Sequence, residues 1–146
     1  MSFTERTQYF HFEVPEGWIN RSMIVWSAPP QPGQAATPNV LVAYDALAEG
    51  EDLSHYVGRQ LKELMSKGSN FHLDLRRDTV LDSQPAVELV FEWDTSSARL
   101  KQRQIYSLLA DGRVMTFVNT AAAADFVRAE SEFQQVARSF GWSESR

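Results

Sequence analysis

Residues 100–121 read LKQRQIYSLLADGRVMTFVNTA. This stretch holds two runs of alternating, β-branched and aromatic residues, separated by the dipeptide Asp111-Gly112. An Asp-Gly pair accepts the positive φ angles of a tight turn, so the runs predict antiparallel strands at 100–110 and 113–121, joined as a hairpin. Successive strands that meander in this way favour an antiparallel sheet with helices packed against it.

The rest of the chain holds five more short runs of this kind, each bounded by turn residues. We expect strands at 9–14, 22–27, 39–46, 71–81 and 84–93. Residues 28–38 contain four of the six prolines, a composition typical of a surface loop. This loop either connects two strands passively or contacts a partner as a clamp.

Two segments instead repeat apolar residues every three to four positions, which predicts amphipathic helices. We expect Asp52 to cap the first helix and Gly68 to end it, and Asp125 to cap the second helix, which Gly141 ends. The sequence therefore predicts an α+β fold: a curved antiparallel sheet of about seven strands with two flanking helices. We expect one domain over residues 1–146.

The composition disfavours several classes of protein. A formal net charge of −5 argues against binding to a nucleic-acid backbone. We interpret the alternating charges of Arg99, Lys101 and Arg103, and those of Glu88 and Glu92, as solvated strand faces. The chain has no cysteine, which suits a reducing compartment. Because we find neither a secretory signal nor a membrane-spanning stretch, we expect a cytoplasmic protein that does not insert into the membrane.

The sequence shows no arrangement of residues typical of catalysis or metal binding. His11, His55 and His72 fall on a strand, a helix start and another strand, without the spacing of a metal site or a catalytic triad. The seven glycines are scattered and form no phosphate-binding loop. We therefore predict no catalytic residue, no metal and no cofactor, and a protein that is not an enzyme.

Two of the expected strands, 22–27 and 39–46, are apolar at both odd and even positions. Side chains alternate between the faces of a strand, so Met23 and Val25 point away from Trp26. A sheet with one solvated face would alternate apolar and polar residues, so both faces here must be covered. Either the helices or a second copy of the chain cover them, or one face is an apolar patch that a client protein fills.

Two glutamines occupy positions where the pattern predicts apolar residues. Gln60 lies on the apolar stripe of the first helix, and Gln104 shares a strand face with Leu100 and Tyr106. An unpaired buried carboxamide costs about 1–3 kcal/mol. These glutamines either bond to backbone or water at the edge of the apolar surface, or line it as donors and acceptors for a client. Gly58, in the middle of the first helix, either admits a close neighbour or is simply tolerated.

Four short motifs resemble a known family, in the same order and with similar spacing over almost the whole chain. They are FEVPEGW at 12–18, SMIV at 22–25, YVGRQL at 56–61 and RQIY at 103–106. Together they are similar to the Eag chaperones of type VI secretion effectors, a DcrB-like group with a PsbP-like fold. The chain departs from that group at Asn39, where a serine is expected, and at Gly68, where relatives can carry a larger apolar residue.

The resemblance implies a cytosolic homodimer whose concave apolar sheets hold the N-terminal transmembrane helices of an effector that carries a PAAR domain. Such a chaperone shields these helices from water and supports loading of the effector onto the secretion spike. The client-binding positions that the resemblance implies are Met23, Val25, Leu41, Ala43, Gln60, Leu64, Leu100 and Gln104.

Two other functions are alternatives. A carrier or regulatory domain of the same fold would bind a small hydrophobic ligand between the apolar strands. An enzyme would require a convergent polar site, which the sequence does not show.

Overall fold

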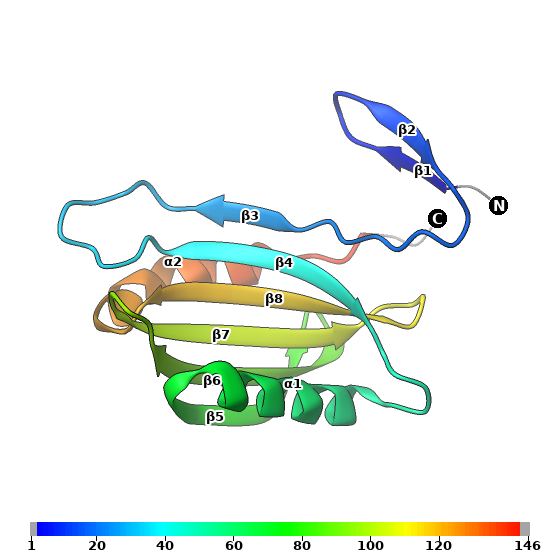
Figure 1. Cartoon of the computed structure of the whole chain (residues 1–146). Helices are drawn as coiled ribbons and strands as arrows, with labels where there is room; N and C mark the ends of the chain where they lie inside the picture. Colours follow the sequence, from blue (N-terminus) through cyan, green and yellow to red (C-terminus); the bar gives the residue numbers. More distant parts are fainter. Residues whose placement is uncertain (1–2, 144–146) are drawn as a thin grey trace.

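The computed structural model describes residues 3–143 (Figure 1). Figure 1 shows a large sheet with α1 on one face and α2 on the other, while β1 and β2 form a hairpin that stands apart. No helix within residues 3–143 is long and apolar enough to cross a membrane. The elements in chain order are β1 (Phe3–Arg6), β2 (His11–Val14), β3 (Ile24–Ser27), β4 (Asn39–Ala46), α1 (Leu53–Lys67), β5 (Ser69–Leu81), β6 (Gln84–Asp94), β7 (Arg99–Leu108), β8 (Arg113–Ala122), the 3₁₀ turn η1 (Ala123–Asp125) and α2 (Phe126–Ser139).

Six strands form one antiparallel sheet in the order β3-β4-β8-β7-β6-β5. The predicted hairpin, β7 and β8, lies at the centre of this sheet. The α+β class, the antiparallel sheet and the two helices are thus confirmed. The sequence pattern does not predict β1, because its four residues are mostly polar and pair only with β2.

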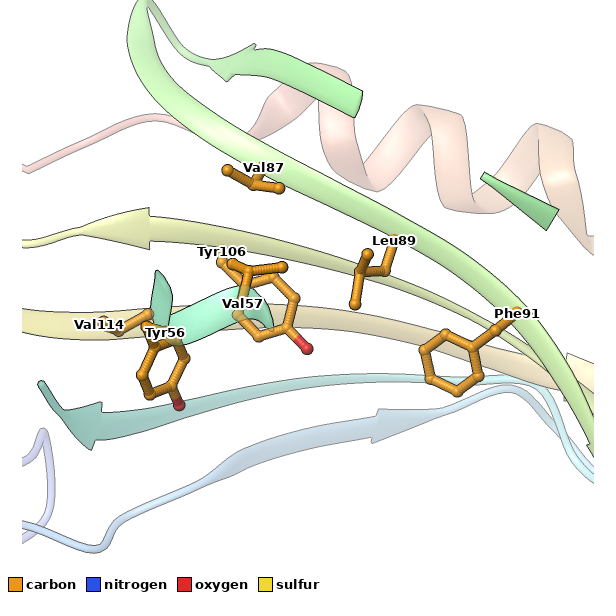
Figure 2. Packing of buried hydrophobic residues seen from close by; sticks show 7 residues of the cluster. All are labelled: Tyr56, Val57, Val87, Leu89, Phe91, Tyr106 and Val114. Atoms are coloured by element: carbon orange, nitrogen blue, oxygen red, sulfur yellow. The ribbon is translucent and has the colours of Figure 1, made fainter. Parts of the chain in front are cut away.

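The face of the sheet beneath α1 holds one buried apolar cluster, and we call this face the α1 face. Tyr56 and Val57 of α1 pack here against side chains from β6, β7 and β8. Figure 2 shows these side chains gathered together over the strands of the sheet. The cluster consists of Tyr56, Val57, Val87, Leu89, Phe91, Tyr106 and Val114.

The opposite face, which we call the α2 face, is covered by the C-terminal helix and the segment that follows it. Phe126, Ala129 and Phe133 of α2 pack against Ala121 of β8 and Val40 of β4. Beyond the helix, a partly buried phenylalanine and tryptophan cover a second cluster on the same sheet face. The even-numbered apolar residues of β4 are thereby covered by the chain itself, as one of the two sequence-based interpretations requires.

The boundaries of α1 follow the sequence signals, and the start of α2 follows them in position but not in its hydrogen bonding. The carboxylate of Asp52 accepts a hydrogen bond from the His55 backbone N–H at 2.8 Å, and the Gly68 N–H closes the helix on the Leu64 carbonyl at 2.8 Å. Asp125 occupies the N-cap position of α2, as predicted, but not with the expected hydrogen bond. Its side chain makes no cap hydrogen bond, because η1 precedes the helix and the carboxylate instead pairs with Arg128.

The interpretation of the β6 and β7 charges as solvated strand faces is also wrong in part. Glu88 is only 5% exposed and lies 2.6 Å from Arg77 and 2.9 Å from Arg103. Arg103 also contacts Glu130 of α2 at 2.8 Å. These side chains lie on the α2 face, where neighbouring strands and α2 bring opposite charges together around the buried Glu88.

Candidate functional site

The α1 face is covered by its helix on one side only. The β-strand register places Val25, Leu41 and Gln104 on the same face as the buried Leu89 and Tyr106. The buried cluster beneath α1 is built from β6, β7 and the start of β8. Toward β3, however, Val25 is 52% exposed and Leu41 is only half-buried.

We call this uncovered part of the α1 face the open groove; the name denotes a strip of sheet surface over β3, β4 and β8, not an enclosed cavity. Its floor is apolar along β3, β4 and β8, where Val25, Leu41 and Val118 lie side by side in the register. Ala43 continues the floor along β4. Val118 is only 7% exposed, Leu41 and Ala43 are half-buried and Val25 is 52% exposed, so the apolar surface that this face presents lies mainly along β3 and β4.

A row of hydrogen-bonded side chains borders the open groove along β7, and we call it the polar ladder. The Tyr106 hydroxyl donates to the side-chain oxygen Oε1 of Gln104, and Gln104 Nε2 donates to Gln102 Oε1 at 2.5 Å. Gln102 Nε2 in turn donates to Thr120 Oγ1 of β8 at 2.8 Å. The ladder therefore runs unbroken along about half the length of β7, within an otherwise apolar face.

Gln60 of α1 is half-buried, and the helical period places it on the same side of α1 as Tyr56. Tyr56, one turn earlier on the same side, donates from its hydroxyl to Asp45 Oδ2 of β4 at 2.8 Å. The aromatic rings of Tyr56 and Tyr106 also touch, with centroids 6.0 Å apart. Four helix residues advance about 6 Å and two strand residues about 7 Å, so we expect Gln60 to lie about level with Gln104.

The two tyrosines stay neutral at the border of the groove. Burial raises the pKa of the Tyr106 hydroxyl. Burial and the hydrogen bond to Asp45 raise the pKa of the Tyr56 hydroxyl as well. Both phenols therefore remain hydrogen-bond donors across the physiological pH range.

The helix start beside them is held by an ion pair. The Arg59 guanidinium contacts Glu51 at 2.8 Å and lies over the Tyr56 ring. Its hydrogen bonds to Glu51 lower the pKa of that carboxyl to about 2. The charges of Arg59 and Glu51 neutralise each other, whereas the Asp45 carboxylate nearby is held by the Tyr56 hydroxyl.

The structure brings most of the predicted client-binding residues together. Val25, Leu41, Ala43, Leu100 and Gln104 share the α1 face by register. Two predicted residues are placed differently. Leu64 packs against the buried cluster and so holds α1 to the sheet, and Met23 precedes β3, where it is 62% exposed.

Sequence reasoning did not single out Gln102 and Thr120, which complete the polar ladder. Gln102 lies two residues before Gln104 and therefore on the same strand face, so the two-residue period of β7 is a signal that could have found it. Thr120 carries no such local signal. It is eighteen positions from Gln102 along the chain, and only the β7–β8 register brings the two side chains together.

A second apolar surface lies on the N-terminal hairpin and the edge strand β3. Phe10 and Phe12 stack on each other with their ring centroids 6.1 Å apart, and both are more than half exposed. Trp18 and Ile19, which follow the hairpin, and Trp26 of β3 are exposed as well. β3 pairs only with β4, so its outer edge has no strand partner within the described chain.

Comparison with known proteins shows the family. The DcrB family model matches residues 10–139. The chain belongs to the DcrB family. This confirms the DcrB-like group that the sequence motifs indicate.

One curated relative of this DcrB-family chain is a Pseudomonas aeruginosa protein named Effector EagT6. It is 25% identical over 111 residues, which are 76% of each chain. Two solved structures share the fold. The Pseudomonas aeruginosa protein PA94, of unknown function, has a TM-score of 0.84 at 21% identity and covers 99% of both chains. CyanoP, a cyanobacterial PsbP from Synechocystis sp. PCC 6803, has a TM-score of 0.55 at 15% identity, over 98% of this chain and 92% of its own. The PsbP-like fold class is thereby confirmed.

Proposed function

We propose that this DcrB-family protein is a chaperone for a type VI secretion effector, and that its open groove holds an apolar helix of that effector. The observation that carries the proposal concerns the α1 face. This face has apolar residues both toward β6 and toward β3, but α1 covers only the part toward β6. A DcrB-family relative named Effector EagT6 supports the connection with this secretion system.

The dimensions of the groove suit a transmembrane helix. From β3 to β7 there are three strand spacings, about 14 Å, and a helix with its side chains is about 10–12 Å wide. The eight residues of β4 extend about 27 Å, close to the roughly 30 Å of a membrane-spanning helix. Burial of about 1,000 Å² of apolar surface contributes on the order of 25 kcal/mol before association costs are subtracted.

The finer features of the client follow from this chemistry. We propose that the client is the N-terminal transmembrane region of an effector with a PAAR domain, shielded from water until it is loaded onto the secretion spike. A helix of roughly 20 apolar residues needs such cover before it enters a membrane. The client-binding residues would be Val25, Leu41, Ala43, Gln60, Leu100 and Gln104 on the groove, with Met23 and Leu64 at its borders.

We further propose a cytoplasmic homodimer in which residues 1–146 act as one effector-chaperone domain. The exposed aromatic residues of the β1–β2 hairpin and the free edge of β3 support self-association, since both leave apolar or unpaired surface in a single copy. Two copies would present two open grooves to one client, and this role is binding rather than catalysis.

Co-expression with an effector's N-terminal region, with and without its hydrophobic helix, tests the proposal. We expect helix-dependent co-purification with the wild-type chain, reduced at least tenfold by Val25→Lys, which places a charge in the groove. Val127→Lys is the matched control, because Val127 is exposed on α2 at the opposite face.

Equal retention by both variants would rule out the groove as the binding site. An effector that stays soluble alone and never co-purifies would reject the chaperone function. A small hydrophobic molecule detected by native mass spectrometry would instead support the carrier alternative.

A further inference from the structure

We propose that Gln102 is a positioning residue of the open groove: held by Thr120, it fixes the Gln104 carboxamide in the orientation that meets a client. The inference rests on the proposed client-binding function. It adds two residues, Gln102 and Thr120, to those that the family resemblance implies.

The polar ladder is anchored at both ends by side chains that cannot move freely. Tyr106 is 1% exposed and packed between α1 and the sheet. Thr120 is 9% exposed, and the β-branch of threonine restricts its χ1 angle. The two glutamines between these anchors are only half-buried. Glutamine has a long, flexible side chain, so without hydrogen bonds at both ends Gln104 would sample several rotamers.

The hydrogen bonds of the ladder leave groups free for a client. A carboxamide offers two N–H donors and an oxygen with two lone pairs. Gln104 uses one N–H toward Gln102 and one lone pair for Tyr106. Gln102 uses one N–H toward Thr120 and one lone pair for Gln104. Each glutamine therefore retains one donor and one acceptor beside the apolar floor, already oriented before a client binds.

Orientation before binding lowers the entropy that association must remove, because an ordered side chain has no rotamers left to lose. The role of Gln102 is thus exerted through Gln104. If only apolar contact area mattered, replacing Gln102 by an apolar side chain would improve the groove. If positioning matters, the same replacement weakens binding, so the two ideas predict opposite signs.

The experiment uses the full chain and two threonines of β8 that lie on the same sheet face. Thr120→Val removes the ladder's terminal hydroxyl, while Thr116→Val removes a hydroxyl opposite Tyr106 that makes none of the ladder's hydrogen bonds. The first readout needs no client: the side-chain amide NMR signals of Gln104. We expect Thr120→Val to shift and broaden these signals, Thr116→Val to leave them in place, and Thr120→Ser to restore them.

The second readout is affinity for a labelled, lysine-flanked Leu/Ala helix of about 20 residues. Loss of one positioning hydrogen bond is expected to weaken binding by about three- to tenfold in Thr120→Val and in Gln102→Met. Thr116→Val should change the affinity by less than about twofold, because its substitution leaves the ladder intact.

The outcomes separate the two proposals. If the wild-type chain does not bind the peptide, the proposed function fails, and the NMR comparison alone decides whether Gln102 positions Gln104. If the wild-type chain binds it but Gln102→Met binds as tightly or more tightly, the positioning role is overturned while the client-binding function stands. If the Gln104 side-chain amide signals are the same in Thr120→Val and Thr116→Val, the positioning role is overturned in either case.

Discussion

Each helix covers only part of its sheet face, and the two uncovered parts differ in character. A six-stranded sheet is about 24 Å wide, whereas one helix spans about 10–12 Å. On the α2 face, β6 and β7 beside the helix carry paired charges such as Glu88 and Arg103. On the α1 face, the open groove carries Val25, Leu41 and Ala43 beside two glutamines.

This difference shows which part of the sheet is satisfied within a single copy of the chain. Over β6 and β7 of the α2 face, Glu88 pairs with Arg77 and Arg103, and Arg103 with Glu130, while Ile24 and Trp26 remain exposed at the β3 edge. The open groove has an apolar floor, whose exposure to water is unfavourable and which a helix of another protein would cover. Its glutamines keep free hydrogen-bonding groups beside that floor. This contrast between the two faces can be tested by substituting neighbouring residues of one strand, because their side chains point to opposite faces of the sheet.

The largest effect is expected from neighbouring residues of β7. Arg103→Met removes a partner of the buried Glu88 and should lower the free energy of unfolding by about 3 kcal/mol, since Arg77 is left as the other partner. Gln104→Met, on the opposite face, should lower it by about 1–2 kcal/mol, because the buried Tyr106 hydroxyl loses its acceptor. Urea denaturation measures both. A larger loss in the Gln104 variant would mean that the open groove, not the charged face, maintains the fold.

A smaller change in stability is expected at two glycines, Gly58 within α1 and Gly68 at its C-terminal end. A Cβ at Gly68 would lie 3.0 Å from the Leu64 carbonyl oxygen and 3.3 Å from Trp93 Cβ. Gly68→Ala should therefore cost about 1–3 kcal/mol by overpacking the covered side. A Cβ at Gly58 would meet only Arg76, at 3.7 Å, so Gly58→Ala should raise stability by up to about 1 kcal/mol.

Thermal unfolding of the two variants checks this pair. A higher melting temperature for Gly68→Ala would contradict the close contact between the end of α1 and Trp93 of β6. Because no backbone lies near Gly58, its glycine is tolerated in the helix rather than required by a close neighbour.

The smallest effect concerns pH and Tyr106, which lies at the border between the covered and open sides. Its pKa is raised by burial in the folded chain, above about 10 in the unfolded chain. The protonated Tyr106 hydroxyl therefore contributes its full share to the free energy of unfolding below pH 10. As the pH rises above 10 this contribution falls, by on the order of 1 kcal/mol between pH 10 and 11. Tyr106→Phe should reduce this decline, measured by urea denaturation at both pH values. An unchanged decline would assign it to other groups.

Local signals predicted much of the fold. The turns, the strands on either side of Asp111-Gly112 and both ends of α1 follow from short-range chemistry, since a tight turn and a helix cap involve only a few neighbouring residues. The position of the start of α2 was predicted in this way, but its hydrogen bonding was not. Asp125 has the right chemistry for a cap, but the 3₁₀ turn before it directs its carboxylate to Arg128 instead.

The candidate site was predictable only where it follows the period of one element. Alternation along β4 and β7 placed Leu41 and Gln104 on defined strand faces, and the helical period placed Gln60 on the stripe of α1. Alternation could not show that Glu88 is buried, because its partners come from β5 and β7. Nor could it separate β1 and β2 from the main sheet, since strand pairing is a long-range choice.

The sequence by itself determined the order of the elements, the apolar character of both faces of β3 and β4, and the family motifs. Each of these depends on residues a few positions apart, whose geometry the backbone imposes. Only the tertiary structure decided which face stays open and which residues complete the polar ladder. Those outcomes depend on where α1 lies across the sheet and on the β7–β8 register, which joins Gln102 to Thr120 over a long stretch of chain.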